Sequence, residues 1–174
     1  MDEIEVSTVI YLPPEEVYEF LVDFPRYTRY SKHLQEVRRY GDGSPGTEYD
    51  LRFTWWKLSY TARSRVTDLS PPNEIEWAVV KDIEATGYWR VDEIDPPEDE
   101  AHACRVWLYI EYDPHSAHVG ALNLPRFVSL DWVVRKVKPL ILEEAQRVVE
   151  RIVADIEGRR RTVELTIHQP PDLA

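Results

Sequence analysis

The stretch from Leu12 to Tyr40 constrains the fold more than any other part of the chain. Pro13 ends a preceding strand because proline cannot donate to a β ladder, and Pro14 suits the first turn of a helix. The next apolar residues recur at helical spacing, at Val17, Phe20, Leu21 and Phe24. Pro25 ends this helix, and residues 26–33 are expected to form a further helical turn or two. A strand, two short helices and a return to strand by residue 40 leave few architectures open.

Alternating apolar and polar residues dominate the middle of the chain and predict antiparallel strands. One face of these strands is expected to carry Tyr49, Leu51, Phe53 and Trp55, then Tyr60, Ala62, Ser64 and Val66, then Ile75, Trp77 and Val79, then Gly87, Trp89 and Val91, and finally Val106, Leu108 and Ile110. Short turns such as 41–46 and 70–73 join consecutive strands. Short connections of this kind indicate a meander of hairpins.

The last third of the chain predicts one long helix, Phe127–Glu157. Its apolar stripe steps by three or four residues through Leu130, Val134, Val137, Ile141, Ala145, Val148, Ile152 and Ile156. Pro139 lies inside the stripe, and we expect it to kink the helix or to break it in two. Gly158 suits the C-cap. The segment 162–167 alternates and predicts a short extra strand, and 159–174 is interpreted as a C-terminal extension of a single domain, 1–158.

Composition excludes several classes of protein. The 174 residues include 21 basic and 32 acidic side chains, for a net charge of −11, which argues against nucleic-acid binding. No apolar run is long enough to predict a membrane span. The acidic N-terminus is not typical of a signal peptide, and a single cysteine suits a reducing cytoplasm. Few of the basic residues are lysine, a pattern typical of salt-loving organisms, although ordinary acidity with a bias toward arginine is the simpler alternative.

Several segments resemble the START-like, or polyketide cyclase/dehydrase-like, superfamily, which is also called SRPBCC or Bet v 1-like. They are 6–41, with its double proline and its Val-Asp-Phe-x-Arg-Tyr helix end, the hairpin 70–77, the strand 87–91 and Ile-Glu-Tyr-Asp-Pro at 110–114. The resemblance spans about residues 3–157. It implies the α+β helix-grip fold, in which a curved antiparallel sheet of about six to seven strands surrounds the long C-terminal helix. It also implies binding of lipids, quinones, hormones or polyketides, which only some members convert chemically.

A narrower resemblance links the chain to the coenzyme Q-binding branch of this superfamily. That branch typically has a second proline after the tyrosine of its Asp-Phe-x-x-Tyr segment. Here Thr28 and Ser31 occupy that neighbourhood. The resemblance therefore implies a protein that binds an apolar molecule in a cavity, and it does not identify that molecule.

We predict an interior cavity that binds an apolar small molecule, such as a lipid, an isoprenoid or quinone, or a polyketide-like chain, as a carrier or sensor. Its expected lining is Phe24, Tyr27, Tyr30, Phe53, Trp55, Tyr60, Ser64, Trp77, Trp89, Leu108, Val134, Val137 and Ile141. The alternative for each ring is ordinary core packing, and for Tyr60 and Ser64 a hydroxyl bonded to a nearby group. The segments 23–33 and 113–125 are expected to form the mouth.

An enzyme, a cyclase or aromatase acting on a polyketide-like chain, is the alternative function, and it needs an ionisable group in the cavity. Tyr60 is available, and Arg90 or Glu93 would point inward if a bulge shifted their strand, but no acid–base pair is evident. We predict no catalytic residues, no cofactor and no metal. His115-x-x-His118 lacks further ligands, and Cys104 is interpreted as a structural thiol.

Aromatic residues on the outer face of the sheet suggest a second hypothesis, a surface that binds a protein partner. Trp107 and Tyr109 lie opposite Val106 and Leu108, so they are expected on the outer face of the sheet, where exposed rings indicate a protein partner or a homodimer. The alternative is that arginines such as 105 and 63 cover them. Three arginines, 159–161, could contact RNA or an acidic lipid surface, but favourable charge at a helix end is the simpler interpretation.

Overall fold

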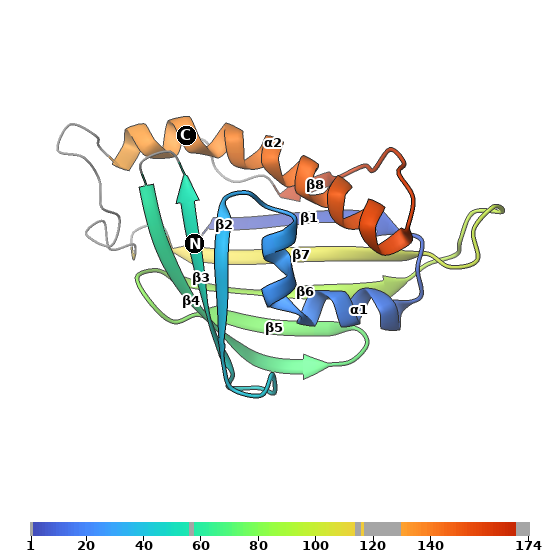
Figure 1. The fold of residues 1–174 in the computed structure, drawn as a ribbon, viewed down its shortest axis with the longest axis horizontal. Helices are drawn as coiled ribbons and strands as arrows, with labels where there is room; N and C mark the ends of the chain where they lie inside the picture. Colours follow the sequence, from blue (N-terminus) through green and yellow to red (C-terminus); the bar gives the residue numbers. More distant parts are fainter. Residues whose placement is uncertain (1, 56–57, 114–115, 117–129, 170–174) are drawn as a thin grey trace.

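The computed structural model describes the backbone of residues 2–55, 58–113, 116 and 130–169, and the side chains of 2–54, 59–113, 116 and 143–168. The elements, in chain order, are β1 (Asp2–Ile10), α1 (Pro14–Val22), the 3-10 helix η1 (Phe24–Arg29), β2 (Leu34–Tyr40), β3 (Glu48–Trp55), β4 (Leu58–Ser70), β5 (Glu74–Val79), β6 (Glu84–Glu93), β7 (Cys104–Asp113), α2 (Leu130–Glu157) and β8 (Thr166–Gln169). They form a curved sheet with α2 across one face (Figure 1).

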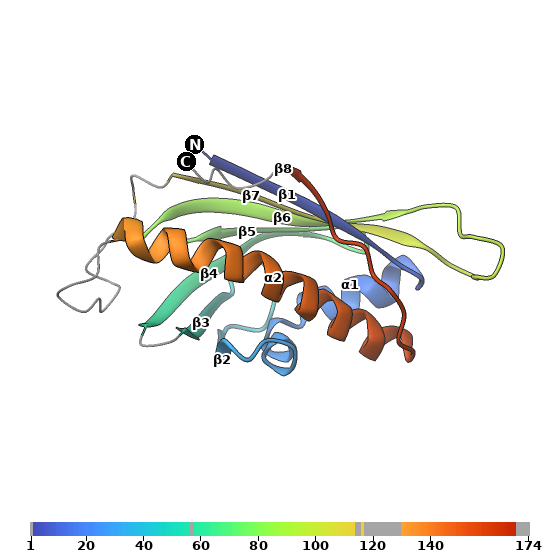
Figure 2. The ribbon, with the colours of Figure 1, turned by 90° about the horizontal axis from the view of Figure 1, so that it is seen from above.

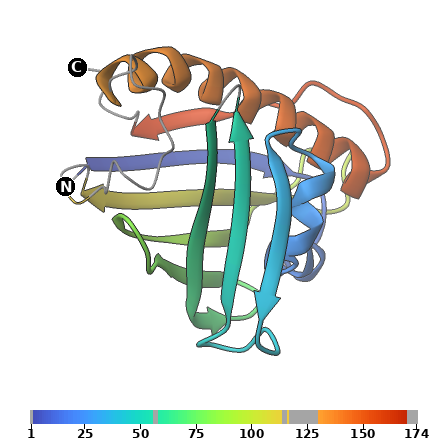
Figure 3. The same cartoon turned by 60° about the vertical axis from the view of Figure 1, so that its left-hand side comes forward.

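The described strands make one antiparallel sheet in the order β2-β3-β4-β5-β6-β7-β1-β8. Strands β2–β4 run steeply across the direction of β1 and β7, so the sheet curls around its inner face (Figure 3). The predicted alternation is confirmed: Leu51 pairs with Ala62 and Trp89 pairs with Leu108. The predicted strand count of six to seven was too low, because β8 joins the edge of β1 as an eighth strand.

The two short helices follow from the prolines between Pro13 and Pro25. Pro13 has an extended ψ of 152° and precedes α1, while Glu15 and Glu16 occupy its first turn, where negative charge stabilises the helix dipole. The Asp23–Phe24 junction then redirects the chain into η1. The Leu12–Tyr40 block therefore packs two helical pieces against one end of the sheet (Figure 1).

Helix α2 is continuous from Leu130 to Glu157, so Pro139 does not break it in two, and the alternative that Pro139 kinks the helix stays a prediction. Gly158 ends it, with a φ of +78° and a hydrogen bond from its N–H to the carbonyl of Ala154 at 3.1 Å. A left-handed residue after the last turn is the conformation that favours glycine. In the part of the chain that is described, no helix combines the length and apolar character that crossing a membrane requires.

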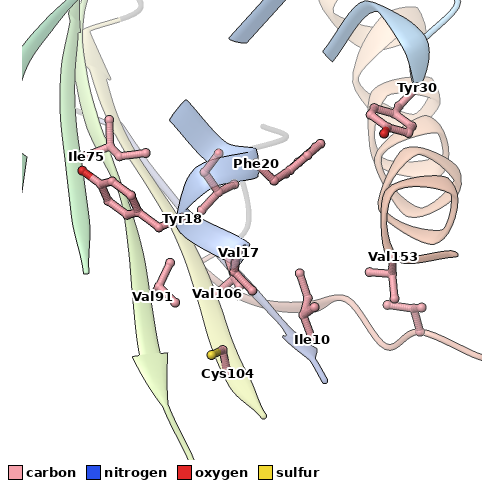
Figure 4. Close-up of a cluster of buried hydrophobic side chains, with 12 residues drawn as sticks. Ile10, Val17, Tyr18, Phe20, Tyr30, Ile75, Val91, Cys104, Val106 and Val153 are labelled. Carbon is pink, nitrogen blue, oxygen red and sulfur yellow. The ribbon is translucent and has the colours of Figure 1, made fainter. Parts of the chain in front are cut away.

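The core fills the space between α1, the sheet and the C-terminal half of α2. Val17 of α1, Ile75 of β5 and Val91 of β6 are fully buried there, and Val153 of α2 closes the cluster (Figure 4). Tyr18 joins it and donates its hydroxyl hydrogen to the carbonyl of Glu74 at 3.0 Å. The core thus packs α1 against the sheet, and the remaining space between α2 and the sheet is not filled by it.

Candidate functional site

A cavity of about 300 Å³ lies between the inner face of the sheet and the C-terminal half of α2. Figure 2 shows α2 running along this face of the sheet. Most wall residues are apolar. The described wall consists of Val6, Ser7, Thr8, Ile10, Phe20, Leu21, Tyr27, Ser31, Leu34, Phe53, Trp89, Val106, Leu108, Ala145, Val148, Val149, Ile152, Val153 and Leu165. Core residues of α1 and β1 form one end of it, so the cavity continues the hydrophobic core.

The hydroxyl groups of the wall already have protein partners. Ser7 Oγ is hydrogen-bonded to His168 Nε2 at 2.7 Å, and Thr8 Oγ1 donates to the carbonyl of Glu164 at 2.9 Å. The Tyr27 hydroxyl donates to the carbonyl of Leu21. Ser31 Oγ accepts a hydrogen bond from the His33 N–H at 3.3 Å. Burial, with the charge of Asp23 adding to it, raises the pKa of Tyr27 well above its usual 10.0. The Tyr27 hydroxyl therefore stays neutral.

Four residues predicted to contact a ligand belong to this wall: Tyr27, Phe53, Trp89 and Leu108. Five others have described side chains that are not part of it: Phe24, Tyr30, Tyr60, Ser64 and Trp77. The side chains of Trp55, Val134, Val137 and Ile141 lie outside the described residues. Contact of any of them with a ligand stays a prediction.

Two aromatic rings of the Leu12–Tyr40 block, Phe24 and Tyr30, pack behind the cavity wall and do not line the cavity. The Phe24 ring meets Tyr49 edge-on at 4.8 Å between centroids and meets Tyr27 at 5.5 Å. The Tyr30 hydroxyl donates to the carboxylate of Asp155 on α2, and its ring meets the edge of Phe20 at 5.7 Å. These contacts hold Tyr27 and Phe20 in place as wall residues.

The inner-face residues Tyr60 and Trp77 find other neighbours along the sheet. The Tyr60 hydroxyl donates to Asp82 at 3.3 Å, and burial together with that carboxylate raises the pKa of Tyr60 to about 12. The Trp77 ring lies over Gly87, its cross-strand partner. The Tyr60 hydroxyl is therefore bonded to the connection between β5 and β6, and the Trp77 ring contacts β6.

The polar side chains considered for catalysis on β6 do not enter the cavity. Strand β6 pairs with β7 in unbroken register, so the bulge that would turn Arg90 inward is absent from this described pair. Arg90 lies on the outer face, 5.1 Å from the Trp107 ring centroid. Glu93 is exposed at the strand end. The bulge on which a role for Arg90 depended is therefore absent from the described β6–β7 pair, and neither Arg90 nor Glu93 belongs to the described wall.

The wall residues that were not predicted come mainly from β1 and α2. Val148 and Ile152 belong to the apolar stripe of α2, and that periodicity could have identified them. Ser31 lies in a short connection and carried no comparable signal. Leu165 lies in the segment 162–167, whose alternation predicted a short strand, but nothing in that pattern placed Leu165 at the cavity. Depth inside a cavity is a property of the folded chain, and a repeat of two or 3.6 residues does not encode it.

Charged residues tie η1 to α2 beside the cavity. Asp155 accepts a hydrogen bond from Arg26 at 3.2 Å as well as from Tyr30, and these bonds lower the pKa of Asp155. Arg151 of α2 donates to the carbonyl of Tyr30 at 2.8 Å. The segment 23–33 predicted as the mouth is thus fixed on α2. Apart from Asp113 and Ser116, the loop 113–125 lies outside the described residues.

The outer face of β6 and β7 carries a row of rings. Tyr88 stacks on Tyr109 at 5.1 Å, and the Trp107 ring lies between Arg90 and the His168 ring, 4.7 Å from the latter. Arg105 approaches Trp107 as predicted, at 6.0 Å. Arg63, which the alternative also named, does not cover Trp107 or Tyr109, because it binds Asp50 and lies over Tyr40. A homodimer through Trp107 and Tyr109 stays a prediction.

The single cysteine is buried and hydrogen-bonded inside the protein. Cys104 is fully buried, and its thiol donates to the carbonyl of Leu12 at 3.1 Å. Burial, with the nearby carboxylates, raises the pKa of Cys104 to about 11, so the reactive thiolate is scarce at neutral pH. Histidines 115 and 118 lie outside the described residues, and within those described no group of three potential metal ligands is present.

Comparison with known proteins agrees with this geometry. A family model described as polyketide cyclase / dehydrase and lipid transport matches residues 1–157. No curated protein matches the sequence. The ZhuI aromatase/cyclase from Streptomyces sp. R1128 is similar in structure, with 16% identity, a TM-score of 0.66 and coverage of 92% of this chain and 96% of that one. A START superfamily protein from Mycobacterium smegmatis has 14% identity, a TM-score of 0.61 and coverage of 90% and 99%.

A third solved structure, TTHA0849 from Thermus thermophilus, has 17% identity, a TM-score of 0.60 and coverage of 90% of this chain and 97% of that one. At such identities the structures share the fold alone. The sequence match carries the family assignment, since it runs from the first strand to the end of α2. The chain belongs to the polyketide cyclase / dehydrase and lipid transport family.

Proposed function

We propose that the protein binds the hydrocarbon part of a small molecule in the cavity under α2, as a carrier or sensor. The observation that carries this proposal is the wall itself. Its described side chains are mostly apolar, and its four hydroxyl-bearing residues already have partners inside the protein. A wall of this kind favours an apolar guest, because a polar guest would lose its bonds to water without gaining new ones.

Burial of apolar ligand surface would be the main source of affinity in a cavity of this kind. Removing roughly 200 Å² of apolar ligand surface from water stabilises a complex by about 5 kcal/mol, at about 25 cal/mol per Å², before the entropy of binding is subtracted. Phe53 supports a guest in particular, because this wall residue is still 39% exposed. A ligand would cover that ring.

The family description names both cyclases and lipid transport, and the structural neighbours include an aromatase/cyclase and a START superfamily protein. Catalysis would need an ionisable group at the ligand. Among the described wall residues, Tyr27 has the only side chain that could ionise in water, apart from alcohols, and burial keeps it neutral. The wall therefore supports binding over conversion.

Replacing Val148 with Phe is expected to fill the cavity and to weaken binding of an apolar guest. Val148 is a wall residue on α2, and the added ring would occupy space that the guest needs. We expect the Kd of N-phenyl-1-naphthylamine, a neutral probe whose fluorescence rises in apolar surroundings, to increase at least about tenfold, or about 1.4 kcal/mol.

The matched control is the same substitution at Val80, which is 37% exposed directly after β5 and is not in the wall. Val80→Phe should leave the Kd unchanged. Absence of probe binding to the unaltered protein, or equal affinity of the two variants, would contradict the proposal. Turnover of a polyketide-like chain by the unaltered protein would favour the enzyme instead.

A further inference from the structure

We propose that residues 159–169, which follow the family match, form a wall of the cavity and limit the length of the ligand, with Leu165 as the side chain that sets this limit. The inference rests on the proposed function. The family model ends at residue 157, whereas Leu165 is part of the cavity wall. The size of the site therefore depends on a segment that the family pattern does not include.

The segment returns from the end of α2 to the edge of the sheet. Figures 2 and 3 show it leaving the helix and reaching β8 beside β1. Strand β8 pairs antiparallel with β1 at Ser7 and Val6. Because β1 would otherwise be the last strand on this side, the added segment extends the sheet toward α2 and narrows the opening between them.

Several contacts tie the middle of the segment to both sides of the cavity. Val163 is only 3% exposed and belongs to the hydrophobic core. Its carbonyl accepts a hydrogen bond from Gln146 of α2 at 2.8 Å, and the neighbouring carbonyl of Glu164 accepts one from Thr8 of β1 at 2.9 Å. Leu165 follows directly, so its position in the wall is fixed from the helix and from the sheet.

The two ends of the segment are also held. Near its start, Arg161 donates two hydrogen bonds to Glu157 and one to the carbonyl of Val9, all at 2.8–2.9 Å. Near its end, His168 bonds to Ser7 at 2.7 Å. A side chain supported in this way resists displacement by a guest, which is the property that a length limit requires.

Leu165 and Ile167 provide a matched pair for the test. Residues two apart in an extended segment point to the same side. Leu165 is in the cavity wall, whereas Ile167 is 40% exposed and is not. The same change thus alters a residue of the described wall at one position and an exposed residue on the same side of the segment at the other.

The experiment measures N-phenyl-1-naphthylamine binding and its displacement by straight-chain alcohols from 1-octanol to 1-hexadecanol. Leu165→Trp should raise the Kd of the probe about tenfold. Leu165→Ala should move the best-binding alcohol to one longer by about two to three carbons, because it removes three carbons from the wall. Ile167→Trp and Ile167→Ala should change neither quantity. Near-ultraviolet circular dichroism checks that each variant folds.

The outcomes separate the two proposals. An unaltered protein that binds neither the probe nor any alcohol contradicts the proposed function. An unaltered protein that binds them, with the same alcohol preference in Leu165→Ala as in Ile167→Ala, overturns the length limit alone. If Leu165→Trp does not fold, the alcohol series with the milder Leu165→Ala still decides the question.

Discussion

Replacing Glu157 with Ala is expected to lower the free energy of unfolding by about 3 kcal/mol. The Glu157 side chain is only 2% exposed. Its carboxylate accepts two hydrogen bonds from Arg161 and one from the N–H of Tyr11, each at 2.8 Å. Removing it leaves the partly buried Arg161 guanidinium without its carboxylate partner, although the bond to the Val9 carbonyl remains. Deleting one member of a buried ion pair costs more than replacing both, because a buried charge is left without compensation. The side chain of Arg161 is 19% exposed, which keeps the expected loss at the lower end for buried pairs.

Urea unfolding followed by circular dichroism measures this change. Glu150→Ala is the control, since Glu150 is an exposed carboxylate on the same helix that accepts one bond from Gln146. Its loss should change stability by less than about 0.5 kcal/mol. Glu157→Gln should fall between the two, because an amide oxygen can still accept the Tyr11 bond. Equal stabilities of Glu157→Ala and Glu150→Ala would contradict this account of the pair.

The lowered pKa of the Glu157 carboxylate makes the free energy of unfolding depend on pH. Burial alone would raise the pKa of Glu157, but the hydrogen bonds from Arg161 and Tyr11 outweigh it, so the pKa lies below its ordinary 4.5. A depressed pKa in the folded state contributes stability that is present above the unfolded value and is lost as the pH falls through the folded one. The unaltered protein should therefore lose stability relative to Glu157→Gln below about pH 4.5, and the gap between them should be constant above about pH 6.

The elements that the sequence predicts well are those whose exposure repeats at a fixed spacing. The inner faces of β3–β7 were predicted correctly because alternate residues in a strand face alternate sides. The stripe that includes Val148 and Ile152 predicted α2 for the same reason. Pro139 shows the limit of a local rule: proline inside a helix kinks or breaks it, and the sequence did not decide between the two, whereas α2 is not broken.

The candidate site could be predicted only in part, because a pattern gives the face of a side chain and not its depth. Trp77 and Trp89 share the inner face on neighbouring strands, yet Trp89 reaches the cavity while Trp77 covers Gly87. Leu165 illustrates a different difficulty. Its place in the wall follows from the pairing of β8 with β1, a contact between the two ends of the chain.

Replacing Gly87 with Ala is expected to destabilise the protein by about 3 kcal/mol, the upper range for overpacking. Strand propensity predicts the opposite sign, since Ala is favoured over Gly inside a strand by about 0.5–1 kcal/mol. The neighbours decide the outcome. A Cβ at Gly87 would lie 2.8 Å from Cη2 of Trp77 and would also clash with the carbonyl oxygen of Tyr109. The indole can shift, but the backbone of β7 is held by its pairing with β6.

Gly158→Ala provides the matched control for this substitution. Gly158 has a φ of +78° and no atom within 4 Å of the added Cβ, so only backbone strain of about 1 kcal/mol applies. Thermal and urea unfolding should therefore rank Gly87→Ala well below Gly158→Ala. Adding Trp77→Leu to Gly87→Ala should cost at least about 1 kcal/mol less than the sum of the single changes, because the two sites are in contact. Strict additivity would show that the ring over Gly87 does not determine the cost, and that the Tyr109 carbonyl alone does.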